Sequence, residues 1–157
     1  MKVQEIMTTS PACCLPTDST SRAARIMKDM DTGIVPVIDD EKSRKLIGVV
    51  TDRDLCLAVI AEAKDPESVQ VRDCMARTVV SCTVDDEVEK AVDLMRDNQV
   101  RRIPVVDREG TIQGILSLAD LMNRTEVPPV KTKEALKNIS EPSDDASKPR
   151  AHVKKSA

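Results

Sequence analysis

Two stretches of the chain place apolar residues at the spacing of one helix face, with charged residues between them. A polar segment of the kind that starts a helix precedes each stretch, at 15–19 and at 83–86. Residues three or four positions apart lie on one side of a helix, so the spacing predicts two amphipathic helices that each bury one side. The apolar positions are Ala23, Ile26, Met27 and Met30 in the first helix and Val88, Ala91, Val92 and Met95 in the second.

Short apolar runs follow each of these helices. They are too apolar for exposed strands and are joined in twos by charged loops, which predicts pairs of buried strands. A further helix is expected after each pair. The strands are expected at 34–38, 46–50, 103–106 and 112–116, and the further helices at about 52–63 and 118–123.

The order of elements recurs because the sequence repeats. Met7 matches Met75, and the segment 36–39 matches 104–107, after which the first copy has two extra residues in a charged loop. Two long copies are typical of a pair of similar subdomains packed on each other rather than of a solenoid. Each copy consists of a strand or loop, a helix, two strands and a helix. We place the first copy at 1–64, a linker at 65–70 and the second copy at 71–125.

The segment 126–157 differs in character from the two copies. It is rich in proline steps and has almost no apolar periodicity. We expect this tail to be disordered, apart from a turn of helix around 133–139. Its end, at 148–155, is basic and could contact an acidic partner, although a solvated tail is the interpretation we favour.

Composition narrows the function classes. A formal charge of -3 and a pI near 5.3 provide no field that attracts a polyanion, and the 157 residues include no Trp, Tyr or Phe on which bases could stack. Nucleic acid is therefore an unlikely partner. No apolar run has the length of a signal peptide or of a membrane helix. We expect a cytoplasmic protein that does not enter a membrane.

Cysteine and histidine usage argues against a metal centre and against catalysis. The five cysteines form no C-x-x-C pair, and the one histidine, His152, is in the tail. We interpret the cysteines as reduced and mostly buried, with a thiol sensor at Cys13 and Cys14 as the alternative. The chain has no Gly-rich phosphate loop, H-E-x-x-H or nucleophile elbow, so we expect no enzyme activity.

A short motif occurs once in each copy, where a strand gives way to a helix. It consists of a glycine, two apolar residues, a hydroxyl residue and, three positions later, an aspartate. A hydroxyl followed by an acid at this spacing is the pattern of a capping box, which alone would explain both residues. The same pair at the end of a strand can also hold the vicinal hydroxyls of a ribose. The residues are Gly48, Thr51 and Asp54 in the first copy and Gly114, Ser117 and Asp120 in the second.

With its two copies of these strands and of this motif, the chain resembles a tandem of CBS (cystathionine β-synthase) domains from about Val3 to Arg124. The resemblance implies an α/β fold of two subdomains, each β-α-β-β-α, packed about a pseudo-twofold axis. It further implies two clefts between the subdomains, each formed by residues of both copies, that bind AMP, ADP, ATP or S-adenosylmethionine as regulatory ligands. Modules of this family commonly pair into homodimers.

The resemblance also implies roles for single residues. Asp54 and Asp120 would hold ribose hydroxyls with help from Thr51 and Ser117. Backbone in two strands would line the adenine, and the segments after Met7 and Met75 would close over the base. The residues of the strands are Gly33, Val35, Pro36, Arg102, Ile103 and Pro104, and those of the closing segments are Thr9, Ala12, Thr78 and Val80.

Arginines beside the motifs are candidates for phosphate binding. Arg53, Arg101 and Arg102 are placed where a guanidinium could make paired hydrogen bonds to phosphate, although ordinary surface ion pairs are the alternative. Gly33 and Ile34 stand in the first copy where the second has Arg101 and Arg102. We therefore expect one tighter site and one that is weaker or empty.

The function that these observations favour is a homodimeric sensor of an adenosine-containing ligand. A ligand-free interaction module, acting through dimerisation or on a partner protein, is the main alternative. A nucleic-acid binder ranks third.

Overall fold

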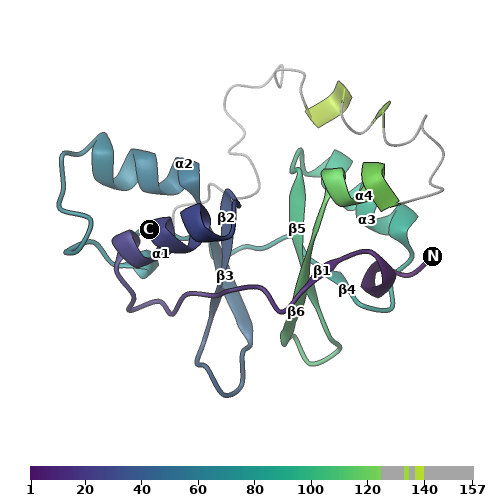
Figure 1. The fold of residues 1–157 in the computed structure, drawn as a ribbon, viewed down its shortest axis with the longest axis horizontal. Helices are drawn as coiled ribbons and strands as arrows, with labels where there is room; N and C mark the ends of the chain where they lie inside the picture. Colours follow the sequence, from purple (N-terminus) through teal and green to yellow (C-terminus); the bar gives the residue numbers. More distant parts are fainter. Residues whose placement is uncertain (125–132, 135–136, 140–157) are drawn as a thin grey trace. The chain divides into compact units, whose positions relative to one another are not determined.

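The computed structural model describes residues 1–124, 133–134 and 137–139, which form two compact α/β units (Figure 1). One unit is the continuous segment Pro11–Val79. The other combines Met1–Ser10 with the part of the chain that begins at Val80. Within the described residues, no helix has the length and apolar character needed to span a bilayer.

The unit of Pro11–Val79 is built on an antiparallel strand pair. All five residues of β2 are buried, as the unbroken apolar run predicted, and the register pairs Ile34 with Thr51. The side chains of Ala23 and Met27 bury one face of the helix that precedes the strands. The elements are α1 (Thr20–Asp29), β2 (Ile34–Ile38), β3 (Leu46–Thr51), α2 (Asp52–Leu55), the π-helical η2 (Cys56–Ile60) and the 3-10 turn η3 (Val71–Asp73).

The unit that begins at Val80 has a four-stranded sheet in the order β1-β6-β5-β4. The register pairs Arg102 with Ser117, which matches the pairing of Ile34 with Thr51 in the first copy. Ala91 and Met95 are fully buried on one side of α3. The elements are the 3-10 turn η1 (Val3–Glu5), β1 (Thr8–Thr9), β4 (Cys82–Thr83), α3 (Val88–Asp97), β5 (Arg102–Val106), β6 (Ile112–Ser117) and α4 (Leu118–Arg124).

Each unit includes the N-terminal segment of the other copy. Strand β1 comes from the start of the first copy but pairs with β6 of the second, with Thr8 opposite Ile115. Ala76 comes from the start of the second copy but exchanges two backbone hydrogen bonds with Val49, at 2.8 and 3.0 Å. The boundaries of the two folded units therefore differ from the boundaries of the two sequence copies.

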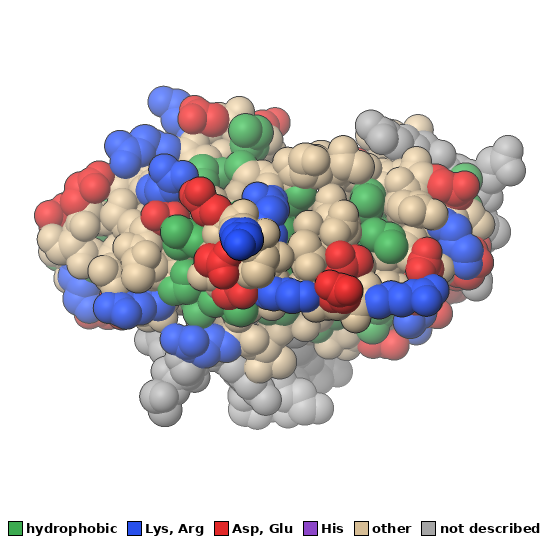
Figure 2. All heavy atoms as spheres, turned by 90° about the horizontal axis from the view of Figure 1, so that it is seen from below, with side chains coloured by type: hydrophobic (Ala, Val, Ile, Leu, Met, Phe, Trp, Pro, Cys, Tyr) green, Lys and Arg blue, Asp and Glu red, His purple; other side chains and the backbone are tan. Residues whose placement is uncertain are grey.

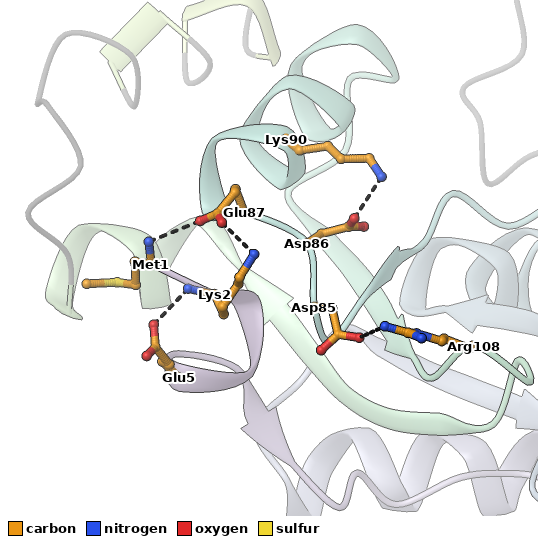
Figure 3. Close-up of polar contacts among 8 residues, drawn as sticks. All are labelled: Met1, Lys2, Glu5, Asp85, Asp86, Glu87, Lys90 and Arg108. Carbon is orange, nitrogen blue, oxygen red and sulfur yellow. Dashed lines mark hydrogen bonds and ion pairs between the residues drawn. The ribbon is translucent and has the colours of Figure 1, made fainter.

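Polar contacts tie the first residues to the N-terminal end of α3 (Figure 3). The Lys2 Nζ pairs with the Glu87 carboxylate, and the Lys2 backbone N–H donates to Glu5 Oε2 at 2.7 Å. The Val3 N–H donates to the Asp86 carbonyl at 3.0 Å. Val3 itself is fully buried in the core of this unit, so the segment is held by packing as well as by charge.

The helix after β3 differs from the helix expected at 52–63. Regular α-helix ends at Leu55 and gives way to η2, where the Ala61 N–H donates to the Cys56 carbonyl at 2.9 Å. Two adjacent β-branched residues, Val59 and Ile60, lose side-chain freedom in an α-helix, which weakens the preference for regular helix here. Leu57 and Ile60 are left 46% and 75% exposed.

The described residues of the tail are helical, at 133–134 and 137–139, where a turn of helix was expected. Ile139 is buried and belongs to the core of the unit that begins at Val80, and Gln99 Nε2 donates to the Asn138 carbonyl at 3.4 Å. The rest of the prediction for 126–157 lies outside the described residues.

Figure 2 shows Lys and Arg side chains interspersed with Asp and Glu on the face that it draws, with apolar side chains between them. That face has no broad area of one charge sign. This mixture agrees with the small net charge of the chain.

Candidate functional site

Two matched strand ends carry the motif residues. In the unit of Pro11–Val79, the Asp52 N–H donates to the Gly33 carbonyl at 3.1 Å, so the start of β2 lies against the start of α2. In the other unit, the Leu118 N–H donates to the Arg101 carbonyl at 3.0 Å. We call these places the first and the second strand end. The first consists of Gly33, Ile34 and Thr51 to Asp54, and the second of Arg101, Arg102 and Ser117 to Asp120.

The hydroxyl and the aspartate of the first strand end form a closed capping box. The Thr51 Oγ1 donates to Asp54 Oδ2 at 2.9 Å and accepts from the Asp54 N–H at 3.2 Å, and the Thr51 N–H donates to the same Oδ2 at 2.9 Å. This is the reciprocal arrangement that satisfies amides at a helix start. The capping interpretation is therefore confirmed for Thr51 and Asp54.

The second strand end repeats this geometry. The Ser117 Oγ donates to Asp120 Oδ2 at 2.6 Å and accepts from the Asp120 N–H at 3.1 Å, while the Ser117 N–H donates to Oδ2 at 2.9 Å. In both pairs the cap uses Oδ2. Within the described part of the chain, Oδ1 of Asp54 and of Asp120 accepts no hydrogen bond.

Burial distinguishes the two aspartates. Asp54 is 8% exposed, whereas Asp120 is half-buried. Burial raises the pKa of the Asp54 carboxyl above its usual value, against the opposing effect of the hydrogen bonds from Thr51. Asp54 therefore takes up its proton at a higher pH than an aspartate with the ordinary pKa does.

The two motifs have neighbours of opposite charge: an acid at the first strand end and arginines at the second. At the first strand end, a β-carbon on Gly33 would lie 3.0 Å from Asp52 Oδ2, so the Asp52 carboxylate occupies the space beside the glycine. At the second, Arg101 and Arg102 are exposed, and neither forms an ion pair with another described residue. The sequence analysis did not place Asp52 next to Gly33. The expected pairing of the two strands that these residues flank would have indicated it.

The structure brings the expected site residues together in two groups, one in each unit. Val35, Pro36, Ile103 and Pro104 are buried in their strands, whereas Thr9 and Thr78 are exposed. Their proposed roles around an adenine stay predictions. The unit of Pro11–Val79 holds Ala12, Gly33, Val35, Pro36, Thr51, Arg53, Asp54 and Thr78, and the other unit holds Thr9, Val80, Arg102, Ile103, Pro104, Ser117 and Asp120.

Burial disfavours the thiolate at four of the five cysteines, whereas Cys56 is exposed; only Cys14 and Cys82 are fully buried, fewer than expected. Burial raises the pKa of Cys14 and of Cys82 to about 12, and it raises the pKa of Cys74 to about 11. Burial also raises the pKa of Cys13, although the Arg44 guanidinium lies 3.5 Å from its sulfur. All five are free thiols, and no cluster of potential metal ligands exists among the described residues.

Comparison with known proteins supports the fold and the family. The model of the CBS domain matches residues 3–61 and 71–126. The chain is 38% identical to the protein YlbB of Bacillus subtilis over 140 residues, which are 89% of this chain and 92% of YlbB.

Solved structures that resemble the chain include two ligand complexes. The structure of CBSX2 in complex with AMP has a TM-score of 0.65 and 27% identity, and the match covers 77% of this chain and 93% of that one. The CBS domain pair of protein MJ0100, in complex with 5'-methylthioadenosine and S-adenosyl-L-methionine, has a TM-score of 0.68 and 24% identity over 78% and 93% of the two chains. At that identity the second likeness shows the fold alone. The two matched segments span both copies of the repeat, and the chain belongs to the CBS domain family as a tandem pair of CBS domains.

Proposed function

We propose that the protein is a cytoplasmic regulatory sensor that binds an adenosine-containing ligand. Asp54 and Asp120 would each hold the two hydroxyls of a ribose. The ligand would belong to the class of AMP, ADP, ATP and S-adenosylmethionine. Two solved relatives support this class, since one is a complex with AMP and the other a complex with 5'-methylthioadenosine and S-adenosyl-L-methionine.

The observation that carries the proposal is the carboxylate oxygen left open in each capping box. A ribose presents two adjacent O–H donors, and a carboxylate is an acceptor with more than one oxygen. The cap holds Oδ2 of Asp54 and of Asp120 in place through two donors each, which leaves Oδ1 of each without a hydrogen-bond donor among the described residues. A cap alone has no need for the second oxygen.

Adenine would then rest against the neighbouring strand. The backbone of Val35 and Pro36 in β2, and of Ile103 and Pro104 in β5, would line the base, since these side chains are buried. The chain has no aromatic side chain, so aliphatic groups and main-chain hydrogen bonds would have to recognise the base. The regulatory step requires that the ligand favours one arrangement of the protein over another.

The test is a calorimetric and thermal-shift panel with AMP, ADP, ATP, S-adenosylmethionine and 5'-methylthioadenosine, with GTP as the control. A ligand at a hundred times its Kd stabilises a one-site protein by about 2.7 kcal/mol, which is readily measured. Binding of adenosyl compounds but not GTP supports the proposal. A protein that ignores every adenosyl compound contradicts it.

A second candidate function, an interaction module, is favoured by an apolar hollow of about 270 Å³ in the unit of Pro11–Val79. Leu55 and Val59 line it, and Leu57 and Ile60 are exposed on the same helical segment. Apolar surface of this kind marks contact sites for other proteins. A second copy of the chain is the occupant we propose, because the family resemblance implies pairing of modules into homodimers.

A further inference from the structure

We propose that Arg44 is a positioning residue for ligand binding, which holds Pro11, Ala12 and Cys13 in the shape that receives the base of an adenosyl ligand. Arg44 lies in the charged loop between β2 and β3, where the first copy has two extra residues. The inference rests on the proposed function and on the expected place of Ala12 over the base. It adds the side chain that orders this segment, which we call the segment 11–13.

The backbone of the segment 11–13 is not held by strand pairing. On one side of it, the Ser10 N–H donates to the Gln113 carbonyl at 3.1 Å, and on the other the Cys14 N–H donates to the Pro36 carbonyl at 2.9 Å. Within the described part of the chain, no hydrogen bond from backbone to backbone involves the three residues between them. These residues are half-buried, so their order must come from another contact.

Arg44 provides such a contact. Its Nη2 donates to the Pro11 carbonyl at 3.3 Å and to Cys13 Sγ at 3.5 Å, and the Cys13 thiol donates to the same carbonyl at 3.3 Å. One guanidinium thus joins both ends of the segment 11–13, on either side of Ala12. Arg44 is half-buried, and a hydrogen bond from a charged donor is stronger than one from a neutral donor.

The two copies differ at the position of Arg44. Arg44 and Gly110 each lie four residues before the motif glycine of their copy, Gly48 and Gly114. Both have left-handed backbone, with φ values of +51° and +83°. Glycine adopts this conformation freely, whereas arginine does so at a cost in free energy. A large cationic side chain at a position where the backbone favours glycine indicates a role for that side chain.

The loop that carries Arg44 is itself well ordered. Asp39 Oδ1 accepts from the Ser43 hydroxyl at 2.6 Å and from the Lys45 N–H at 2.8 Å. Asp40 Oδ1 accepts from the Ser43 N–H at 2.8 Å, and the Asp40 carbonyl accepts from the Arg44 N–H at 3.0 Å. Because the backbone on both sides of Arg44 is fixed, its side chain can order a second segment.

An ordered segment favours binding because less freedom is lost when the ligand arrives. The chain has no aromatic side chain, so main-chain groups must do much of the recognition of a base. Within the described residues, the N–H groups of Ala12 and Cys13 and the Ala12 carbonyl form no hydrogen bond. Arg44 therefore raises affinity by fixing the donors and the acceptor that the segment 11–13 offers.

The first measurement tests, without ligand, whether Arg44 orders the segment. The variant R44G gives the first copy the residue of the second. Relief of the left-handed backbone and a freer unfolded chain oppose each other, so the free energy of unfolding should change little. The order parameters of the Ala12 and Cys13 amides, from ¹⁵N relaxation, should fall from about 0.85 to below about 0.6.

The second measurement is ligand affinity. AMP and 5'-methylthioadenosine are titrated into the parent and R44G, and the amide signal of Ala12 reports the binding event that reaches the segment 11–13. R44G should weaken each compound that the parent binds by about three- to tenfold, the effect of one lost hydrogen bond. The factor should be the same for both, because they share adenine and ribose and differ in the charge of the 5' group.

Arg108→Ala is the matched control for both measurements. Arg108 is the arginine of the corresponding loop in the second copy, where it is 87% exposed and pairs with Asp85 at 3.2 Å. Its removal should change neither the order parameters of the segment 11–13 nor the affinity for either compound. Urea unfolding of each variant verifies that a loss of affinity is not a loss of fold.

The outcomes separate this inference from the proposed function. If the parent protein binds neither compound, the proposed function fails, and the inference fails with it. If the parent binds but R44G leaves the order parameters or the affinity unchanged, only the positioning role is wrong. Loss of AMP affinity alone, or a ligand that leaves the Ala12 signal unshifted, would also overturn that role. A looser segment with an equal loss of both compounds at unchanged stability supports it.

Discussion

Gly114 lies so close to Met7 that a β-carbon on the glycine would stand 2.7 Å from the methionine sulfur, and equally 2.7 Å from the carbonyl oxygen of Thr8. The same relationship recurs at Gly48, where a β-carbon would stand 2.7 Å from the carbonyl oxygen of Ala76. Methionine side chains adapt, but a carbonyl in a paired strand does not move cheaply. The motif glycines are therefore needed where the N-terminal segment of the other copy crosses.

Gly114→Ala and Gly48→Ala should each destabilise the protein by about 1–3 kcal/mol, because a new methyl group must displace paired backbone. Urea unfolding measures the change in the free energy of unfolding. Gly110→Asn is the control, since Gly110 has open space around it and a φ of +83° that asparagine tolerates better than other residues. If the alanine variants are as stable as the control, the backbone segment that packs against each glycine must move aside at little cost in stability.

Asp120→Ala and Asp54→Ala should each abolish or weaken at least tenfold the binding of an adenosyl ligand at their own strand end, because each removes the acceptor for two ribose hydroxyls. Each should also cost about 1 kcal/mol of stability through loss of the helix cap. Calorimetry and thermal unfolding separate the two effects. Thr51→Ser keeps the hydroxyl and serves as the control; unchanged ligand affinity in both aspartate variants would disprove the ribose assignment.

Binding at the first strand end should weaken as the pH falls through the raised pKa of Asp54, because the protonated carboxyl loses part of its capacity as an acceptor. The loss should begin at a higher pH than for a carboxyl with the ordinary value of 3.8. Titration of 5'-methylthioadenosine binding from pH 7 downward, with circular dichroism to verify the fold, measures this. Asp54→Asn should remove this dependence on pH.

The sign for stability at Asp54 is opposite to that at Asp39 and Asp40. A carboxyl whose pKa is higher in the folded state contributes stability at pH values below 3.8, and this contribution is lost as the pH rises through the folded value. Asp39 and Asp40, whose pKa values are lowered by hydrogen bonds, contribute stability that is lost as the pH falls. Asp54→Asn should therefore gain stability relative to the parent between acidic and neutral pH. A parallel stability profile for the two proteins would contradict the raised pKa.

Ile60→Glu should convert a homodimer into monomers if a second copy covers the apolar hollow, because the charge would be buried without a partner in the interface. Size-exclusion chromatography with light scattering gives the mass of the species in solution. Lys42→Glu, a charge change in the loop after β2, is the control. A parent protein that is already monomeric at high concentration would refute the homodimer.

Much of the fold could be predicted from the sequence where a local pattern carries the information. The burial of Ala91 and Met95 on one side of α3 follows from the spacing of apolar residues, and the caps at Thr51 and Ser117 follow from a hydroxyl and an acid three residues apart. These features depend on residues that are close in sequence. Local periodicity and capping chemistry were therefore sufficient.

What the sequence did not reveal depends on distant contacts. The pairing of Thr8 with Ile115 involves a strand of two exposed residues, which has no periodicity to detect. The approach of Asp52 to Gly33 requires the register of β2 against β3, and η2 departs from a helix pattern that looked continuous.

The crossing of β1 into the second copy has a consequence for synthesis on the ribosome. Residues 1–10 leave the ribosome about a hundred residues before β6, with which β1 pairs. At 5–20 residues per second this delay is on the order of ten seconds. During this interval the continuous segment Pro11–Val79 already contains every strand and helix of its own unit. The segment 1–10 must therefore wait, unpaired, while Pro11–Val79 folds, and its Val3 and Ile6 stay accessible to chaperones or proteases until β6 emerges.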